Sequence, residues 1–414
     1  MKIYKVGGAV RDEILGLEPK DHDYVIVGAT PDELLENGFN KVVGADFPVY
    51  ILDGDEYALA RTERKVGSGH TGFETNYDPT VTLEEDLMRR DLTINAMAQD
   101  LDTGKIIDPF NGREDIKNGV LRHVSYAFSE DPLRVLRIAR FAARLSFVIA
   151  PDTISLLRDM VGNGDLKSLS RDRVWSEVAR GSQEKYPHKF FSTLRDIRAL
   201  PDLFGESHHI FKETGLRIMD MANANLTPSQ FWMGMFFDAD NITVEQFIKK
   251  LPLPKVISRS IQFASEFVEL DMKDSDKLME FLLRWNQFQD PTMLIGIDEM
   301  FNINREYYVR HRDTLIDAVK ECSLLNYDSL SDEQRATAHG PEIGRIIYKK
   351  RRKLIDKWIS MYDEDHVMYS YVKRSNSLLK CADDFLDRLD RIDINDIDSL
   401  RHAIDEFKDA TPIT

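Results

Sequence analysis

The pattern of apolar and polar positions changes partway along the 414 residues of the chain. Up to about residue 120, short apolar runs such as 24–27, 48–52 and 57–61 alternate with turns rich in Gly, Pro and Asp. Runs of this length between turn residues predict strands. Helical patterns at 10–17 and 31–36 interrupt them, so this part of the chain is predicted to be α+β.

From about residue 130 onward, the apolar positions follow a helical period almost throughout. We therefore expect an all-helical second part. Proline-containing breaks at 150–151, 200–201 and 339–341 mark candidate boundaries within it. Residues 363–409 place Asp among Ile and Leu, which predicts an acidic amphipathic helical extension.

The first strand signals surround the first candidate chemistry. Gly7 and Gly8 let the backbone approach a phosphate chain closely, and Arg11 adds a cation beside them. Asp21 and Asp23 lie two apart in a segment that continues as a predicted strand, so both should face one site. Paired carboxylates suit Mg²⁺, and metal ions held in this way catalyse in-line displacement at phosphorus. The segment therefore predicts a nucleotidyl-transfer site.

A second charged cluster follows a long polar segment. Residues 64–85 are too polar and too rich in glycine for a core element, and a long loop inside a compact domain is usually functional. Beyond it, Arg89 and Arg90 supply cations for a triphosphate. Asp91 and Asn95 have the chemistry to hydrogen-bond to ribose hydroxyls.

The third cluster opens a strongly predicted helix. Asp131 is expected as its N-cap and Pro132 as its first helical residue. Arg134, Arg137 and Arg140 then recur every three residues on one broad face, where like charges repel one another unless an anion lies between them. A nucleoside triphosphate is such an anion.

Asp131 and Arg134 also have the chemistry to distinguish nucleobases. An ionised carboxylate only accepts hydrogen bonds, and a guanidinium only donates them. Cytosine and adenine present an amino donor beside a ring-nitrogen acceptor, whereas uracil and guanine present a carbonyl beside an N–H group. The pair therefore matches C and A, and a site of this kind can discriminate by about 10⁴-fold or more.

Composition restricts the class of partner. The net charge of −16 argues against a general nucleic-acid binder, because such proteins are basic overall, so any RNA contact must use a local patch. The best candidate patch contains Lys349, Lys350, Arg351 and Arg352, which predict either a phosphate-backbone contact or a solvated helical face.

Cysteine usage and hydropathy indicate the compartment. Cys322 and Cys381 make no metal-ligand spacing, which favours a reducing environment. The chain starts without an apolar signal core, and no apolar run is long enough to cross a membrane. We expect a cytoplasmic protein without membrane contact.

Six segments of the chain form an ordered series: GGAVRD at 7–12, KDHD at 20–23, ARTER at 60–64, RRDLTINA at 89–96, DPFNG at 108–112 and EDPLR at 130–134. The series resembles the motifs of class II CCA-adding tRNA nucleotidyltransferases, densely and in order over residues 1 to about 200. The resemblance implies a polymerase-β-like nucleotidyltransferase head at 1–120 and a helical neck at 121–200 that holds the base-reading helix. A helical body at 201–340 and a tail at 341–414 would grip tRNA.

The resemblance further implies an enzyme that adds C, C and A to the tRNA 3′ end from CTP and ATP. Mg²⁺ would lie on Asp21 and Asp23, and Asp131 and Arg134 would act as the protein template. The other residues that would contact the nucleotide are Gly8, Arg11, Arg90, Arg137 and Arg140. Residues 64–85 would correspond to the family's flexible loop, which is linked to the switch from C to A.

The body departs from longer members of this group, which carry a His-Asp phosphohydrolase domain. The corresponding stretch, 235–240, has Phe where the histidine would be, and His208 and His209 lack enough partners. We therefore predict that hydrolase activity is absent. The resemblance does not explain the acidic extension after about residue 360.

Other functions stay open beside CCA addition. Poly(A) polymerases of the same superfamily share this head but usually have a Gly-Arg-Arg-Phe-type segment in the region where this chain has residues 43–48. Enzymes that add only C or only A are also conceivable, although the long segment at 64–85 argues against A-only addition. A non-catalytic tRNA-binding remnant is the remaining alternative, and it would have no need of Asp21 and Asp23.

Overall fold

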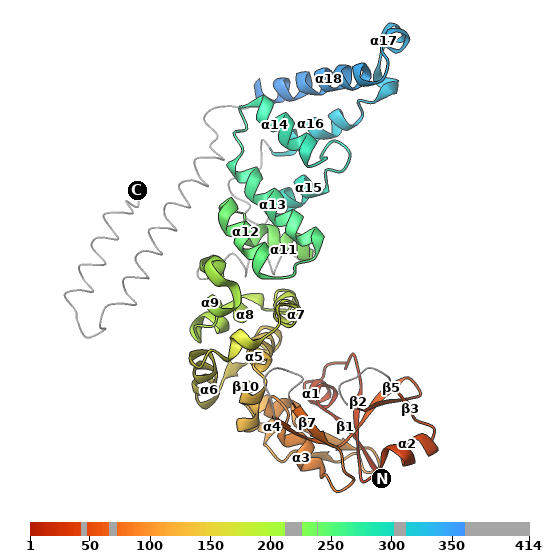
Figure 1. Cartoon of the computed structure of the whole chain (residues 1–414), viewed down its shortest axis with the longest axis vertical. Helices are drawn as coiled ribbons and strands as arrows, with labels where there is room; N and C mark the ends of the chain where they lie inside the picture. Colours follow the sequence, from red (N-terminus) through yellow and green to blue (C-terminus); the bar gives the residue numbers. More distant parts are fainter. Residues whose placement is uncertain (43–47, 66–72, 212–225, 238, 302–311, 361–414) are drawn as a thin grey trace, which may run out of the picture. The chain divides into compact units, whose positions relative to one another are not determined.

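The computed structural model describes residues 1–42, 48–65, 73–211, 226–237, 239–301 and 312–360. The chain divides into two compact units, the first made of 1–215 with 250–252 and the second of 216–249 with 253–414. Figure 1 labels the elements of both units, which are described separately below.

The first unit is built on a mixed seven-stranded sheet with the order β3-β4-β5-β2-β1-β8-β9 (Figure 1). The central strand β1 pairs antiparallel with both β2 and β8, and β2 pairs parallel with β5. The strands are β1 (Lys2–Val6), β2 (Asp23–Val27), β3 (Asn40–Lys41), β4 (Val49–Leu52), β5 (Asp55–Leu59), β8 (Ala98–Asp100) and β9 (Ile106–Ile107).

Alternation along the strands buries both faces of this sheet. Val25 belongs to one apolar cluster together with Leu87, whereas the next residue, Ile26, belongs to another together with Leu34. Successive strand side chains point to opposite faces, so helices must cover both. The helices of this part are α1 (Gly8–Ile14), α2 (Pro31–Glu36), α3 (Leu83–Met88) and α4 (Gly112–Asn118), with a 3₁₀ turn at Thr93–Asn95.

Two of these helices begin at capping boxes. The Thr30 hydroxyl accepts from the Glu33 N–H, and the Glu33 carboxylate accepts from the Thr30 N–H. Thr82 and Glu85 repeat the arrangement at the start of α3. Each box satisfies two backbone donors that a helix start leaves open. The helix predicted at 31–36 is confirmed with these bounds.

The segment 64–85, expected to be a long loop, contains regular structure. Strands β6 (Thr62–Lys65) and β7 (Phe73–Asn76) pair antiparallel, and α3 begins at Leu83. Residues 66–72 lie outside the described part. The prediction of a loop is therefore wrong for the flanks of this segment. A two-stranded ribbon pairs its own backbone groups without needing an apolar face, so its polar sequence hid it.

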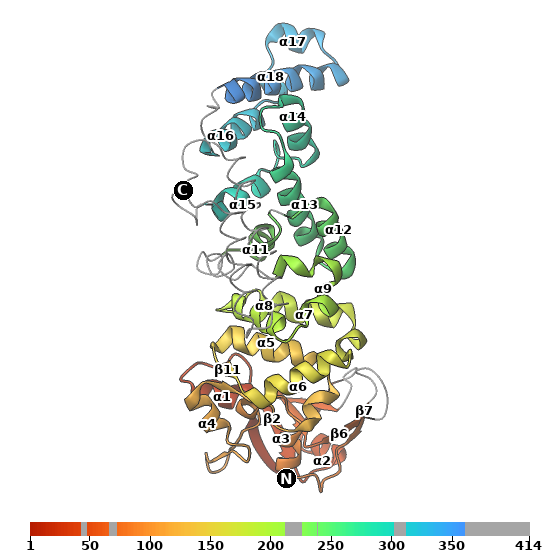
Figure 2. The same cartoon turned by 90° about the vertical axis from the view of Figure 1, so that its left-hand side faces the viewer.

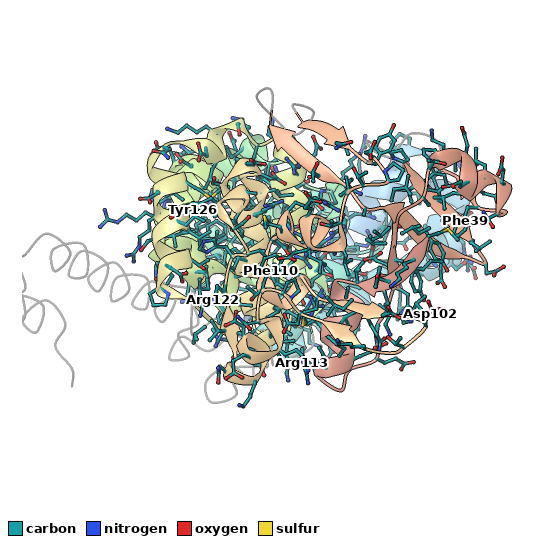
Figure 3. The ribbon with its side chains drawn as sticks, turned by 90° about the horizontal axis from the view of Figure 1, so that it is seen from below. Phe39, Asp102, Phe110, Arg113, Arg122 and Tyr126 are labelled. Atoms are coloured by element: carbon teal, nitrogen blue, oxygen red, sulfur yellow. The ribbon has the colours of Figure 1, made fainter. Side chains whose placement is uncertain are left out.

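Helices make up most of the rest of the first unit. Helix α5 packs against α7 and α8, and Figure 2 shows the three stacked together. In Figure 3, Arg122 and Tyr126 lie on the side of these helices, and Phe39 and Asp102 lie at the opposite side of the head. The elements are α5 (Leu133–Leu145), α6 (Pro151–Gly162), α7 (Arg171–Gly181), α8 (Pro187–Asp196) and α9 (Leu200–Phe204), 3₁₀ turns at Tyr126–Glu130, Asp165–Ser168 and Gly205–Phe211, and the parallel pair β10 (Val120–Leu121) and β11 (Val148–Ile149).

The second unit is helical around an aromatic-rich core that includes Phe263, Phe281 and Trp358. Within the described residues, no helix is long and apolar enough to span a membrane. The helices are α11 (Pro228–Met235), α12 (Asn241–Lys250), α13 (Lys255–Glu269), α14 (Ser275–Arg284), α15 (Thr292–Phe301), α16 (Arg312–Ser323), α17 (Asp332–Thr337) and α18 (Pro341–Ser360), with a 3₁₀ turn at Tyr327–Ser329. The predicted acidic extension, 363–409, lies outside the described residues.

Candidate active site

The turn between β1 and α1 brings a glycine, a cation and a carboxylate together. Gly7 has φ 71° and ψ −130°, and a Cβ atom there would lie 2.9 Å from Nη1 of Arg90. Glycine is therefore required by the backbone conformation and by the approach of Arg90. The strand register sets Val6 opposite Asp23, so the beginning of β2 lies beside this turn.

Asp21 and Asp23 are both exposed, and neither carboxylate has a hydrogen bond or ion pair to any residue that the structure describes. Only Asp23 belongs to β2, which begins there, and Asp21 precedes the strand. The prediction that both residues lie on one strand is corrected in this respect. Because β1 turns away at Gly7, it offers no backbone partner to the residues before Asp23.

Arg90 is held by one carboxylate, and one of its nitrogens is buried without a partner. Its Nη2 donates to Oδ2 of Asp86 over 3.2 Å. Its Nε is buried and has no hydrogen-bond partner. A buried donor left unpaired is costly. The Arg90 atom that lies beside the Gly7 turn is Nη1.

Asp91 and Asn95, predicted to contact ribose hydroxyls, instead form part of a hydrogen-bonded chain. Nη1 of Arg11 donates to Oδ1 of Asn95 over 2.6 Å, and the Asn95 amide donates to Oδ1 of Asp91 over 2.9 Å. Nε and Nη2 of Arg137 both donate to Oδ2 of Asp91, over 2.9 and 2.7 Å. The chain connects α1 to α5 through the 3₁₀ turn. A ribose contact would require these bonds to open.

The charges in this chain are strongly coupled. Burial by itself would raise the pKa of Asp91, but Arg137 and the Asn95 amide overcome that effect and lower the pKa to about 2. Burial lowers the pKa of Arg11, against the pull of Asp12. Asp91 is therefore an ionised carboxylate that holds the guanidinium of Arg137 in place.

Three guanidinium groups surround one aromatic ring on α5. The carbon atoms of the Arg11, Arg137 and Arg140 guanidiniums lie 5.2, 5.8 and 5.4 Å from the centroid of Phe141. Cations at this distance are attracted to the ring face. The cluster concentrates positive charge between α1 and α5.

The arginines of α5 were expected to have an anion between them, such as a triphosphate, and the protein supplies acceptors of its own. Nε of Arg140 donates to Glu177 over 2.7 Å and its Nη1 to Glu184 over 3.5 Å. Arg137 has Asp91. The three-residue spacing therefore does not by itself require a bound anion.

Asp131 and Arg134 lie at the start of α5. The helix begins at Leu133 with Pro132 as its N-cap residue, so the expected cap is displaced by one position. The Asp131 carboxylate still accepts from the Leu133 N–H over 3.1 Å. Pro132 itself has φ −58° and ψ −20°, which suits a proline at the opening of a helix. Arg134 donates through Nη1 to the Ala127 carbonyl and through Nη2 to the Arg89 carbonyl, over 2.8 and 2.6 Å.

Sequence reasoning missed the carboxylates that organise the second cluster. Asp86 is fully buried, and it accepts from Arg89 over 2.7 Å as well as from Arg90. Glu63 accepts from Arg61 and Arg89 over 2.9 and 3.1 Å. Asp86 stands in the acidic run 84–86 and resembles a solvated helix start there, although its spacing from Leu87 and Leu83 places it on the inner face of α3.

In the basic run of α18, three of the four predicted RNA-binding residues have partners within the protein. Lys350 donates to the Ser329 carbonyl, Arg351 to the carbonyls of Cys322 and Leu325, and Arg352 pairs with Asp276 and Asp356. Lys349, in contrast, is exposed and makes no such contact with the described residues. Of the four predicted RNA-binding residues, one is thus free to meet a partner.

The stretch predicted to be a degenerate hydrolase motif ends α11 and forms apolar core. Phe236 is fully buried, and its ring packs against Phe247 with the centroids 4.5 Å apart and the planes tilted by 42°. His208 and His209 each bond the carbonyl three residues earlier in their 3₁₀ turn. Within the described residues, no group of three or more His, Cys, Asp or Glu is arranged to hold a metal. Asp238 lies outside the described part.

Comparisons with known proteins agree with this geometry. The family model of the poly A polymerase head domain matches residues 3–122. A multifunctional CCA protein of Aromatoleum aromaticum is 54% identical over 245 residues, which cover 55% of this chain and 60% of that protein. The resemblance to class II CCA-adding enzymes is thereby confirmed for the first half of the chain. The chain spans only about half the length of several such relatives, among them the one from Hahella chejuensis, of which it covers 51%.

Solved structures extend the likeness in fold to most of the chain. The Bacillus stearothermophilus CCA-adding enzyme in complex with CTP has a TM-score of 0.61 at 20% identity, over 90% of this chain and 93% of that one. Identity this low shows the fold alone. The predicted fold class, a nucleotidyltransferase head with a helical remainder, is confirmed.

Proposed function

We propose that this protein is a tRNA nucleotidyltransferase that adds or repairs the 3′-terminal CCA of tRNA from CTP and ATP, without a nucleic-acid template. The observation that carries the proposal is the meeting of Asp23, the Gly7 turn and Arg90 beside the central strands. Asp131 and Arg134 lie in the same unit. The multifunctional CCA proteins related to its first half support this choice.

Asp21 and Asp23 are the residues that would hold Mg²⁺. Both are exposed carboxylates without protein partners among the described residues, and such oxygens are the ligands that Mg²⁺ prefers. The bound metal would polarise the α-phosphate and stabilise the pyrophosphate that leaves.

The cations would bind the triphosphate. Nη1 of Arg90 lies beside Gly7, and Nε of the same side chain is buried without a hydrogen-bond partner. Gly8, the residue after Gly7, opens α1. Arg11, Arg137 and Arg140 add positive charge around Phe141. Fixed donors of this kind hold the phosphates in line for attack by the tRNA 3′-hydroxyl.

The second unit would contribute a phosphate-backbone contact to tRNA. Lys349 belongs to a row on α18 with Arg345, Lys353 and Lys357, all exposed and without an ion pair among the described residues. Residues four apart follow one side of a helix. The complex of the Thermotoga maritima CCA-adding enzyme with tRNA, similar in fold with a TM-score of 0.58 at 22% identity over 90% of this chain and 91% of that one, supports tRNA as the partner.

The same proposal includes the division into a head at 1–120, a neck at 121–200, a body at 201–340 and a tail at 341–414, and a cytoplasmic location. A poly(A) polymerase is the second candidate, because the matching head domain carries that name. Residues 43–47 of the segment that led us to favour CCA addition, 43–48, lie outside the described part.

The decisive experiment uses tRNA transcripts that end at the discriminator base, after C, and after CC. Each is incubated with Mg²⁺ and CTP, ATP or both, and the products are resolved at single-nucleotide length. We expect growth by C, C and A that then stops. Long adenylate tails would identify a poly(A) polymerase, and tRNA binding without extension would identify a non-catalytic remnant.

A further inference from the structure

Asp131 is held from a second helix. One nitrogen of Arg173, Nη2, donates to both carboxylate oxygens of Asp131, over 3.2 and 3.0 Å. Arg173 lies in the first turn of α7, 42 residues along the chain. The contact therefore joins α7 to the start of α5.

Helix α7 is held in place on either side of Arg173, at its first turn and at Glu177. Ser170 caps its start by accepting from the Arg173 N–H. Further along, Glu177 is buried and accepts from Arg140 of α5 over 2.7 Å. Arg173 therefore projects from a helix that a buried ion pair ties to the base-reading helix.

The bonding of Asp131 leaves acceptor capacity for a ligand. Its Oδ1 accepts from the Leu133 N–H and from Arg173, and its Oδ2 accepts from Arg173 alone. A carboxylate offers about four acceptor positions in all. Its side chain is 25% exposed, so Oδ2 can still meet a donor from outside.

Arg134 is also held in place by hydrogen bonds, in its case to backbone carbonyls. Its two terminal nitrogens each donate to a backbone carbonyl, of Ala127 and of Arg89. A guanidinium has five N–H groups, so donors remain. Both members of the pair are thus oriented by the protein before a base arrives.

We propose that Arg173 is the positioning residue that orients the Asp131 carboxylate for base recognition. The terminal torsion of an aspartate side chain is broad and is poorly fixed by the backbone. Without Arg173, only the Leu133 N–H bond would restrain the carboxylate, and it could turn to suit other bases. The inference rests on the proposed function, since it assigns a source of selectivity to that site.

The test compares equilibrium binding of CTP and UTP in the presence of Ca²⁺, which slows transfer, for the full chain and three variants. Arg173→Ala removes the contact, and Arg173→Lys keeps the charge. Arg180→Ala is the matched control on the same helix, because that side chain is 63% exposed and lies 3.9 Å from its nearest acid, Glu177. Thermal melting of each variant reports on folding.

We expect Arg173→Ala to reduce the preference for CTP over UTP by about tenfold or more, the effect of losing a charge-assisted hydrogen bond. Arg173→Lys should recover part of the preference, and Arg180→Ala should keep all of it. In an Asp131→Ala background, Arg173→Ala should add no further loss, because the two residues act through one contact.

An Arg173→Ala variant that melts earlier but keeps the wild-type preference would overturn the inference and leave Arg173 a structural residue. A further loss in the Asp131→Ala background would overturn it as well. Failure of the proposed function is distinguishable, because it would appear as selective nucleotide binding by the wild type without extension of tRNA.

Discussion

The arginines of the first unit differ in what neutralises them. Arg137 is paired with Asp91 and Arg140 with Glu177, both across buried contacts. Arg90, in contrast, meets Asp86 with one nitrogen and keeps its Nε unpaired. Arg90 thus keeps a buried Nε for which the protein supplies no acceptor, whereas Arg137 and Arg140 are neutralised by carboxylates of the same unit.

The proposed metal-binding role of Asp23, the exposed residue at the start of β2, can be tested by replacing one carboxylate oxygen with an amide nitrogen. We expect Asp23→Asn to lower the rate of nucleotide transfer by about 10²- to 10⁴-fold, because an amide oxygen carries no charge for the metal. tRNA binding should not change. Asp32→Asn, at another exposed head position, is the control. Wild-type turnover in the Asp23 variant, measured by single-nucleotide extension, would exclude the metal assignment.

The Asp91 ion pair predicts a defined dependence of stability on pH. Since the pKa of Asp91 is lowered to about 2 in the folded state, its contribution is complete above the ordinary value near 4 and is lost as the pH falls through about 2. Asp91→Asn should reduce the free energy of unfolding at pH 7 by about 2–3 kcal/mol.

The difference between Asp91→Asn and the wild type should shrink between about pH 4 and pH 2. Urea unfolding at pH 7, 4, 3 and 2 measures it. A difference that stays constant down to pH 2 would contradict the assignment of the low pKa to Asp91.

At the scale of elements, one buried carboxylate links helix α3 to the segments that follow β5 and β1. Asp86 accepts from the Arg61 N–H, from Arg89 and from Arg90. Burial alone would raise its pKa, but Arg89 and Arg90 hold the pKa of Asp86 below its usual range. The carboxylate thus joins the start of the β6–β7 ribbon, α3 and the glycine turn.

We expect Asp86→Ala to destabilise the first unit by about 3–5 kcal/mol, because it leaves clustered arginines without their shared buried partner. Glu84→Ala, an exposed position on the same helix, should stay within about 0.5 kcal/mol of the wild type. Chemical unfolding followed by circular dichroism compares the two. Equal stability of both variants would show that the network around Asp86 is not structural.

At the scale of the whole molecule, a chain with net charge −16 handles an anionic partner only through local patches. The cluster around Phe141 in the first unit and the row on α18 in the second are two such patches. Because the chain as a whole is acidic, selective contact is expected instead of general attraction to nucleic acid.

If the exposed row on α18 contacts tRNA, it should contribute to the salt dependence of tRNA binding. Replacing Lys349 and Lys353 with alanine should weaken tRNA binding and should reduce the slope of log K against log salt by about one per lost contact. Lys320→Ala, an exposed position on α16, should leave the slope unchanged. Filter binding between 50 and 300 mM KCl measures both. An unchanged slope in the double variant would exclude α18 from the tRNA contact.

The sequence by itself determined the class of fold. Strand and helix periods, capping signals and the ordered motifs are local properties, so the mixed head and the helix at 31–36 could be predicted from neighbouring residues. The pairing of Asp21 with Asp23 at a metal site stays a prediction. Gly7 could be singled out for the same reason, since a glycine pair before a charged helix is a local signal.

Only the tertiary structure decided which charges pair with which. The sequence predicted that Asp91 contacts a ribose, whereas in the fold its carboxylate accepts from Arg137 and Asn95. Asp131 likewise accepts from Arg173, a residue of α7. Both contacts with arginine join residues more than 40 positions apart. Ion pairs of this kind depend on distance and burial in the folded state, which no local pattern of residues encodes.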